Sequence, residues 1–100
     1  MSRFQDLLAT GKPVLVDAYA EWCAPCKAMA PGLVVIAHAC EGSAHVVKVD
    51  IDRNHMFATT HQVRGVPTLL LFKNGRVIWR HSGVIAPQAV IDVVLNAAKS

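Results

Sequence analysis

The sequence predicts an α/β protein in which a mixed central sheet of four strands carries helices on both faces. Apolar runs typical of strands alternate along the chain with segments of helical periodicity. The last two strand-like runs are joined by Asn74-Gly75, a dipeptide favoured in two-residue hairpin turns. The 100 residues, of which 53% are hydrophobic, suit one domain over residues 1–100 and are too apolar for a disordered chain.

The first two elements follow from local signals. Ser2 and Gln5 match a capping box, which predicts a short helix over residues 2–10. The next run, Val14 to Ala20, is apolar on both of its faces, as in a strand buried inside a sheet. Its single charge, on Asp17, is out of place in such a strand and marks a candidate functional residue.

A long helix is expected from Cys23 to about Cys40, with Pro25 in its first turn, where a missing N–H costs nothing. The later elements are a strand over 45–51, a helix over 54–61, strands over 68–72 and 77–81, and a helix opening at Pro87. This order gives strands that are covered by helices on two sides, with a hairpin near the end of the chain.

Composition and charge argue against two classes of function, nucleic-acid binding and membrane association. The net charge of +3 comes from Lys and Arg spread along the chain, without the basic stripe interleaved with aromatics that indicates nucleic-acid binding. No run approaches 20 apolar residues, so no membrane partner is expected. The first residues lack a signal peptide, and three cysteines, an odd number, fit a reducing compartment, so a cytoplasmic protein is expected.

The stretch EWCAPCK, residues 21–27, places Cys23 and Cys26 at the start of the long helix. There the unpaired N–H groups and the helix dipole favour a thiolate over a thiol. Cys23 is therefore expected to be the nucleophile. Cys26, one turn further in, is placed to attack the mixed disulfide that Cys23 forms and so to release a reduced substrate.

Two other uses of the cysteine pair compete with this interpretation. A structural zinc site needs four ligands at closed spacing, and here the second pair is missing, because Cys40 and the five histidines are scattered. A permanent disulfide across so short a loop would add little stability. Neither a zinc site nor a permanent disulfide requires the two cysteines to lie at the start of a helix. No bound metal or cofactor is expected.

Several motifs together resemble the thioredoxin family. They are Val16-Asp17, Ala20-Glu21-Trp22-Cys23-Ala24-Pro25-Cys26-Lys27, Ala30-Pro31, the run Arg64 to Gly75, and Gly83. The match in order and spacing runs through nearly the whole chain and implies the thioredoxin fold. It also implies that Pro67 is cis and lies beside the disulfide, with the Val66 backbone pairing with an extended substrate segment.

The resemblance extends to further site residues. It implies that Asp17 is buried; burial would raise its pKa and let it exchange a proton with Cys26, whereas a carboxylate at a strand end that reaches water would not. Lys48 would then be its electrostatic modulator rather than an ordinary surface lysine. The expected substrate surface around Cys23 consists of Trp22, Ala24, Pro25, Gly65, Val66, Pro67 and Gly83.

The chain also departs from the family. Typical members carry Gly where Ala24 stands and an aromatic pair where this chain has Ala18-Tyr19. Fewer residues precede the active site than is usual, and the missing part is the first strand of the family. Strand 46–51 would then become an edge that invites pairing with a second copy. A homodimer is expected, and a monomer whose edge is protected by charged side chains is the alternative.

The resemblance implies a thiol–disulfide oxidoreductase that reduces disulfide-containing protein substrates without a bound cofactor. Its implied electron donor is a flavin-dependent, NADPH-using thioredoxin reductase. Two alternatives remain open at this point. One is a disulfide oxidase or isomerase of an oxidising compartment, and the other is a non-catalytic binding module that uses the Trp22 and Pro67 surface.

Overall fold

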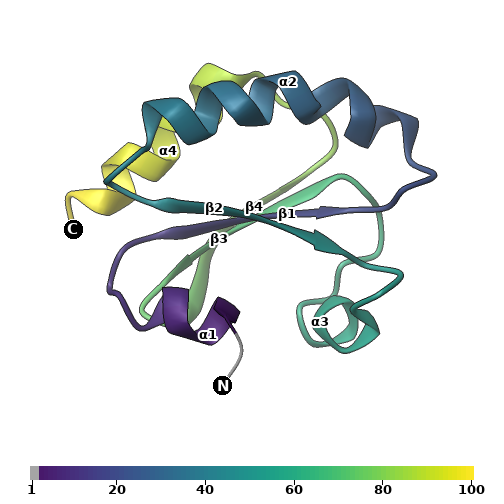
Figure 1. Cartoon of the computed structure of the whole chain (residues 1–100), viewed down its shortest axis with the longest axis horizontal. Coiled ribbons are helices and arrows are strands. Elements are labelled where there is room, and N and C mark those ends of the chain that lie inside the picture. Colours follow the sequence, from purple (N-terminus) through teal and green to yellow (C-terminus); the bar gives the residue numbers. More distant parts are fainter. Residues whose placement is uncertain (1–2) are drawn as a thin grey trace.

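The computed structural model of the chain describes residues 3–100 (Figure 1). The order of helices and strands follows the sequence prediction, including the hairpin near the end of the chain. In chain order they are α1 (Arg3–Leu8), β1 (Val14–Tyr19), α2 (Ala24–Ala39), β2 (His45–Asp50), α3 (His55–Thr60), β3 (Thr68–Lys73), β4 (Arg76–Ser82) and α4 (Pro87–Ala98). None of the helices in this part of the chain has the length and apolar content that a membrane span requires.

The four strands form one mixed sheet, as predicted, and their order in the sheet is β2-β1-β3-β4. β1 pairs parallel with β2 and antiparallel with β3, and β4 returns antiparallel to β3. The turn of this hairpin puts Asn74 and Gly75 at φ values of 53° and 79°, in the left-handed region that such turns require. The hairpin prediction is confirmed.

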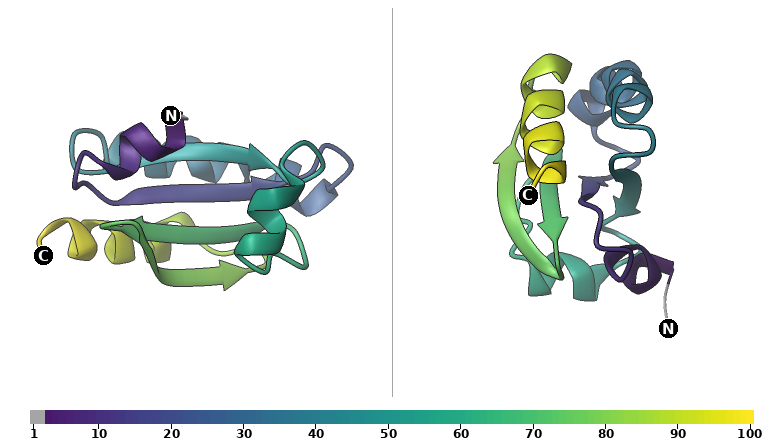
Figure 2. Two further views of the ribbon diagram at one scale, coloured as in Figure 1. Left: turned by 90° about the horizontal axis from the view of Figure 1, so that it is seen from below. Right: turned by 90° about the vertical axis from the view of Figure 1, so that its left-hand side faces the viewer.

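The sheet lies between two layers of helices (Figures 1 and 2). α2 and α4 cover one face, and α1 and α3 cover the other. Since successive strand residues point to opposite faces, β1 supplies apolar side chains to both layers. Leu15 packs with the residues of α2 and α4, whereas Val16 and Ala18 pack with the layer of α1 and α3.

The edge position expected for residues 46–51 is confirmed, because β2 has β1 on one side and no strand described in residues 3–100 on the other. Its side chains are mostly half-buried, and only Asp50 is buried. β1 and β3, by contrast, are buried through five of their six positions. The burial of the two central strands therefore holds the sheet together.

The structure differs from the sequence prediction at some element ends. α1 ends at Leu8, and the capping residue expected at Ser2 lies outside the described residues. α3 begins at His55 rather than Asn54. The Asn54 amide makes no cap, because its Nδ2 donates to the carbonyl oxygen of Asp50, 2.9 Å away, at the end of β2.

Candidate active site

The candidate site begins where β1 leaves the sheet and the chain turns into α2. The N–H of Cys23 donates to the carbonyl oxygen of Ala20 at 3.1 Å, which closes a tight turn directly after the buried strand. Cys23 is the N-cap of α2 with extended backbone angles, and Pro25 occupies the first turn. Local sequence thus fixes the two cysteines at the amino end of a 16-residue helix.

Cys23 and Cys26 form a disulfide. The backbone N–H of Cys26 donates to Sγ of Cys23 at 3.2 Å, so the sulfur caps the helix, as predicted. The same donor would stabilise negative charge on Cys23 in the reduced protein. Only 3% of the surface of Cys23 and 7% of that of Cys26 is exposed, so an attacking group must approach the pair closely.

A second segment lies against the disulfide. The Val66–Pro67 peptide bond is cis, as the family resemblance implies, and Val66 packs against the cluster that contains both cysteines. Gly83 N–H donates to the Pro67 carbonyl oxygen at 2.9 Å, and the Thr68 hydroxyl donates to the Gly65 carbonyl oxygen at 2.6 Å. The first bond joins the residue before β3 to the residue after β4, and the second stabilises the turn that leads into β3.

Trp22 is 69% exposed, yet its ring is held in place. Its indole N–H donates to Oδ2 of Asp52 at 2.8 Å. Asp52 follows β2, and its own N–H donates to Oδ1 of Asp50 at 2.9 Å. Sequence analysis missed Asp52; the only signal was an acidic residue just after β2, at the strand end that borders the cysteines.

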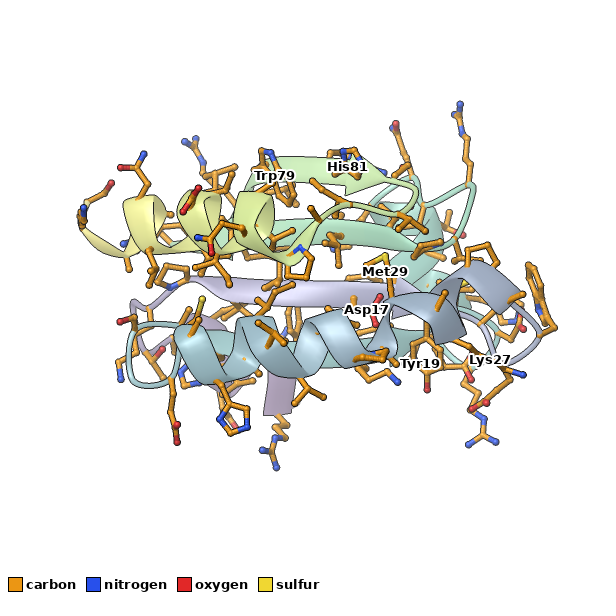
Figure 3. The ribbon with its side chains drawn as sticks, turned by 90° about the horizontal axis from the view of Figure 1, so that it is seen from above. Asp17, Tyr19, Lys27, Met29, Trp79 and His81 are labelled. Carbon is orange, nitrogen blue, oxygen red and sulfur yellow. A yellow bond between two sulfur atoms is a disulfide. The ribbon has the colours of Figure 1, made fainter. Side chains whose placement is uncertain are left out.

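Asp17 lies on the face of β1 that α2 covers (Figure 3). The residue is 2% exposed, and its Oδ1 has no hydrogen-bond partner among the described residues. Burial raises the pKa of this carboxyl, and the positive charge of Lys48 partly offsets that rise. The expectation of a buried carboxyl rather than a solvated one is confirmed.

A hollow of about 170 Å³ connects these groups with the surface. Asp17 and Cys26 line it, together with Tyr19, Ala20, Glu21, Lys27, Ala30 and Lys48. Asp17 and Lys48 are Cα partners in the parallel pairing of β1 with β2. The buried carboxyl and the second cysteine therefore face the same hollow.

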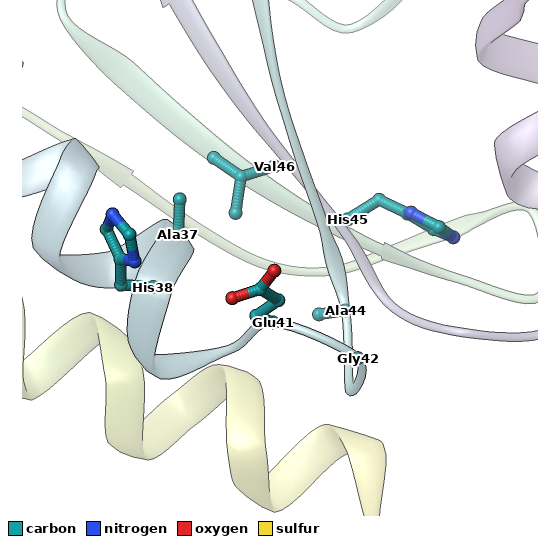
Figure 4. Close-up of a pocket in the computed structure, with 7 residues that line it drawn as sticks. All are labelled: Ala37, His38, Glu41, Gly42, Ala44, His45 and Val46. Carbon is teal, nitrogen blue, oxygen red and sulfur yellow. The ribbon is translucent and has the colours of Figure 1, made fainter.

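Another hollow lies at the far end of α2, where the helix turns into β2 (Figure 4). Its lining includes His38, Glu41 and His45. The His45 ring points away from Glu41, and its Nε2 lies 3.3 Å from the Thr10 hydroxyl. Within residues 3–100 no three His, Cys, Asp or Glu side chains are grouped to hold a metal ion.

Asp17→Asn should make the oxidised protein more resistant to unfolding at neutral pH. Below about pH 4 the carboxyl is protonated in both the folded and the unfolded chain. As the pH rises, the unfolded chain loses this proton first, because burial raises the pKa in the folded protein. The contribution of Asp17 to wild-type stability then falls by up to about 1.4 kcal/mol per pH unit until the folded pKa is reached, and the Asn variant escapes this loss.

Urea unfolding from about pH 4 to about pH 8 measures the effect. The stability difference between Asp17→Asn and wild type should widen as the pH rises and then level off. Asp6→Asn, on the exposed surface of α1, is the matched control and should keep the wild-type pH dependence. Parallel curves for wild type and Asp17→Asn would contradict the burial argument.

Comparisons with known proteins agree with this geometry. The family model described as Thioredoxin matches residues 1–96. Thioredoxin 1 of Chlorobaculum tepidum is 41% identical over 93 residues, which cover 92% of each chain. A bifunctional thioredoxin reductase/thioredoxin of Mycobacterium leprae is 41% identical over 99 residues, which cover 95% of this chain and 22% of that protein.

A solved structure, that of a mutant thioredoxin from Halobacterium salinarum, superimposes with a TM-score of 0.88 at 33% identity. The superposition covers 98% of this chain and 85% of that one. The α/β thioredoxin fold predicted from the sequence is thereby confirmed. With its matching family model, its similar relatives and its Cys23–Cys26 pair in a Trp-Cys-x-x-Cys motif, the chain belongs to the thioredoxin family of thiol–disulfide oxidoreductases.

Proposed function

We propose that this protein reduces disulfide bonds in other proteins by dithiol exchange, using residues 1–100 as one domain. The observation that carries the proposal is the helix-capping hydrogen bond from the Cys26 N–H to Sγ of Cys23. This bond stabilises a thiolate on Cys23, and the thiolate is the form of cysteine that attacks disulfides.

The reaction needs two exchanges. The Cys23 thiolate attacks one sulfur of the substrate disulfide, forms a mixed disulfide, and expels the other substrate sulfur as a thiolate. Cys26 then loses its proton and attacks Sγ of Cys23, which releases the second substrate thiolate and leaves the Cys23–Cys26 disulfide. The two electrons that the substrate gains come from the two thiols of the enzyme.

Asp17 is the proposed acceptor of the Cys26 proton. Both groups line the same hollow, and burial raises the pKa of Asp17 toward the range in which a carboxyl can take up and return a proton. Lys48 limits that rise through its positive charge. In this proposal Asp17 and Lys48 therefore act on the second exchange rather than the first.

The proposed substrate surface surrounds Cys23. An extended substrate segment would pair with the backbone of Val66, beside the cis Pro67, and lie against the Trp22 ring that Asp52 holds. Gly65 and Gly83 leave room for its backbone, because a Cβ built at either glycine meets no atom within 4 Å. Ala24 and Pro25, between the cysteines, complete the surface.

We propose a flavin-dependent, NADPH-using thioredoxin reductase as the electron donor and the cytoplasm as the location. The Mycobacterium leprae relative, whose name joins a reductase to a thioredoxin, supports this pairing. The protein itself needs no bound cofactor for the exchange, since its two sulfurs carry the electrons. Electron transport and the redox balance of the cell are the corresponding roles.

Replacing each cysteine should separate the two exchanges. Cys23→Ser should lower insulin disulfide reduction to the rate of dithiothreitol alone, because the nucleophile is lost. Cys26→Ser should react once and accumulate a mixed disulfide that mass spectrometry detects. Cys40→Ala, at the buried free cysteine, is the control and should keep wild-type activity. Full activity of Cys23→Ser would overturn the proposed function and favour a binding module.

The redox potential separates a reductase from an oxidase or isomerase. We expect the Cys23–Cys26 pair to equilibrate with dithiothreitol buffers near about −270 mV, as a cytoplasmic reductant should. The fraction of reduced protein is measured by thiol alkylation and mass spectrometry. A potential near about −120 mV would instead indicate an oxidase and contradict the cytoplasmic assignment.

We also propose that two copies pair through β2. The N–H groups of His45 and Ile51 donate to the carbonyl oxygens of Pro13 and Tyr19, on the side of β1. Backbone groups alternate in direction along a strand, so the N–H and C=O of Val46 point away from β1, toward the open edge. We expect the two β2 strands to pair antiparallel, with Val47 of one copy opposite Val47 of the other. In this register each Lys48 lies opposite Val46 of the other copy, so the two lysine charges do not face each other.

Val46→Pro tests this pairing. Proline removes the N–H of residue 46 that would bond the second copy, but it removes no hydrogen bond to β1. The variant should therefore be a folded monomer. Light scattering during size-exclusion chromatography gives the mass. A wild-type mass of one chain would show instead that the edge is protected, as its charged side chains allow.

A further inference from the structure

Lys48 is an exposed lysine whose ammonium nevertheless has a defined place. Its Nζ lies 4.4 Å from the centroid of the Tyr19 ring. A cation over an aromatic face is attracted by the negative charge of the ring surface. A long, exposed lysine without such a partner would spread over many rotamers, so Tyr19 restricts where this positive charge can be.

The position of this contact connects it with the active site. Tyr19 and Asp17 are two residues apart on β1 and therefore point to the same face of the sheet. Both line the hollow that also reaches Cys26, and so does Lys48. Among residues 3–100, no ion pair joins Lys48 to Asp17. The ammonium is held over the ring, near the carboxyl but not bonded to it.

We propose that Tyr19 is a positioning residue that holds the Lys48 ammonium at the hollow beside Asp17, and thereby sets the proton exchange between Asp17 and Cys26. The effect of Tyr19 on catalysis rests on the proposed function, in which Asp17 takes up the proton of Cys26. It concerns Tyr19, the aromatic residue of the Ala18-Tyr19 pair that stands where typical family members carry two aromatic residues.

The charged and titratable groups around Asp17 determine the direction of the effect. Lys48 comes from β2, Cys26 and Lys27 from α2, and Glu21 from the segment between β1 and α2. On the other side, β3 places the apolar Leu69 opposite Asp17. Without the ring, water and the carboxylate of Glu21 compete for the Lys48 ammonium. Asp17 then loses nearby positive charge, and its pKa should rise further.

Direct titration of Asp17 in the oxidised protein tests the proposal. Carboxyl ¹³C shifts are followed against pH for wild type and for Tyr19→Leu, Tyr19→Phe and Lys48→Met. Tyr19→Leu and Lys48→Met should each move the Asp17 midpoint upward, by about half a pH unit, a threefold change in the proton equilibrium. Tyr19→Phe keeps the ring and should titrate as wild type does.

The double variant Tyr19→Leu/Lys48→Met distinguishes an effect through Lys48 from a direct effect of the ring. Its midpoint should equal that of Lys48→Met alone. A further upward shift in the double variant would overturn the proposal, because the ring would then act without the lysine. A downward shift in Tyr19→Leu would also overturn it, since the ring would then mainly keep water from Asp17.

Two features keep the test decisive. If Tyr19→Leu does not fold, Tyr19→Trp replaces it, and the stronger attraction of indole for a cation should leave the midpoint at or below the wild-type value. A midpoint above wild type in Tyr19→Trp would count against the proposal. The titration involves no turnover, so it stands or fails independently of whether Cys23→Ser abolishes disulfide reduction.

Discussion

The burial of β1 on both faces is the constraint on which the rest of the structure depends. β1 pairs with β2 on one side and with β3 on the other, and its side chains enter both helical layers. Its end is therefore fixed in space, and the turn from Ala20 to Cys23 starts from that fixed point. Because Cys23 then caps α2, the disulfide is placed by the centre of the fold rather than by a mobile loop.

The same burial makes Asp17 costly to the fold. A carboxyl with an unpartnered oxygen in a buried strand opposes folding whenever it is ionised, and an apolar residue there would serve the sheet better. In the proposed function this cost has a chemical return: a carboxylate in water has a low pKa and is therefore a weak base, whereas the raised pKa of Asp17 would suit it better to take up the proton of Cys26. If Asp17 has the proposed role, stability and reactivity oppose each other at this position, as is common at active sites.

Much of the fold follows from local sequence patterns. The contacts that the sequence does not reveal have a common cause: they join residues that lie far apart in the chain. The apolar run of β1 and the Asn74-Gly75 turn are each encoded within a few residues, so the sequence predicts them. The contact of Trp22 with Asp52 joins residues 30 apart, and no local pattern reveals it. No local pattern in the sequence points to a contact of Tyr19 with Lys48; only the pairing of β1 with β2 brings Lys48 to the Tyr19 ring.

Two acidic residues, one at the end of β2 and one just after it, help to explain why the charge of Lys48 can act on Asp17. Asp50 accepts a hydrogen bond from the Asp52 N–H, and Asp52 in turn accepts one from the indole of Trp22. Carboxylates engaged in such bonds are weaker competitors for an ammonium than free ones. The hydrogen bonds that hold Trp22 therefore also leave the Lys48 charge available to the buried carboxyl. The proposed substrate contact and the proposed proton exchange would then both depend on residues at the carboxyl end of β2.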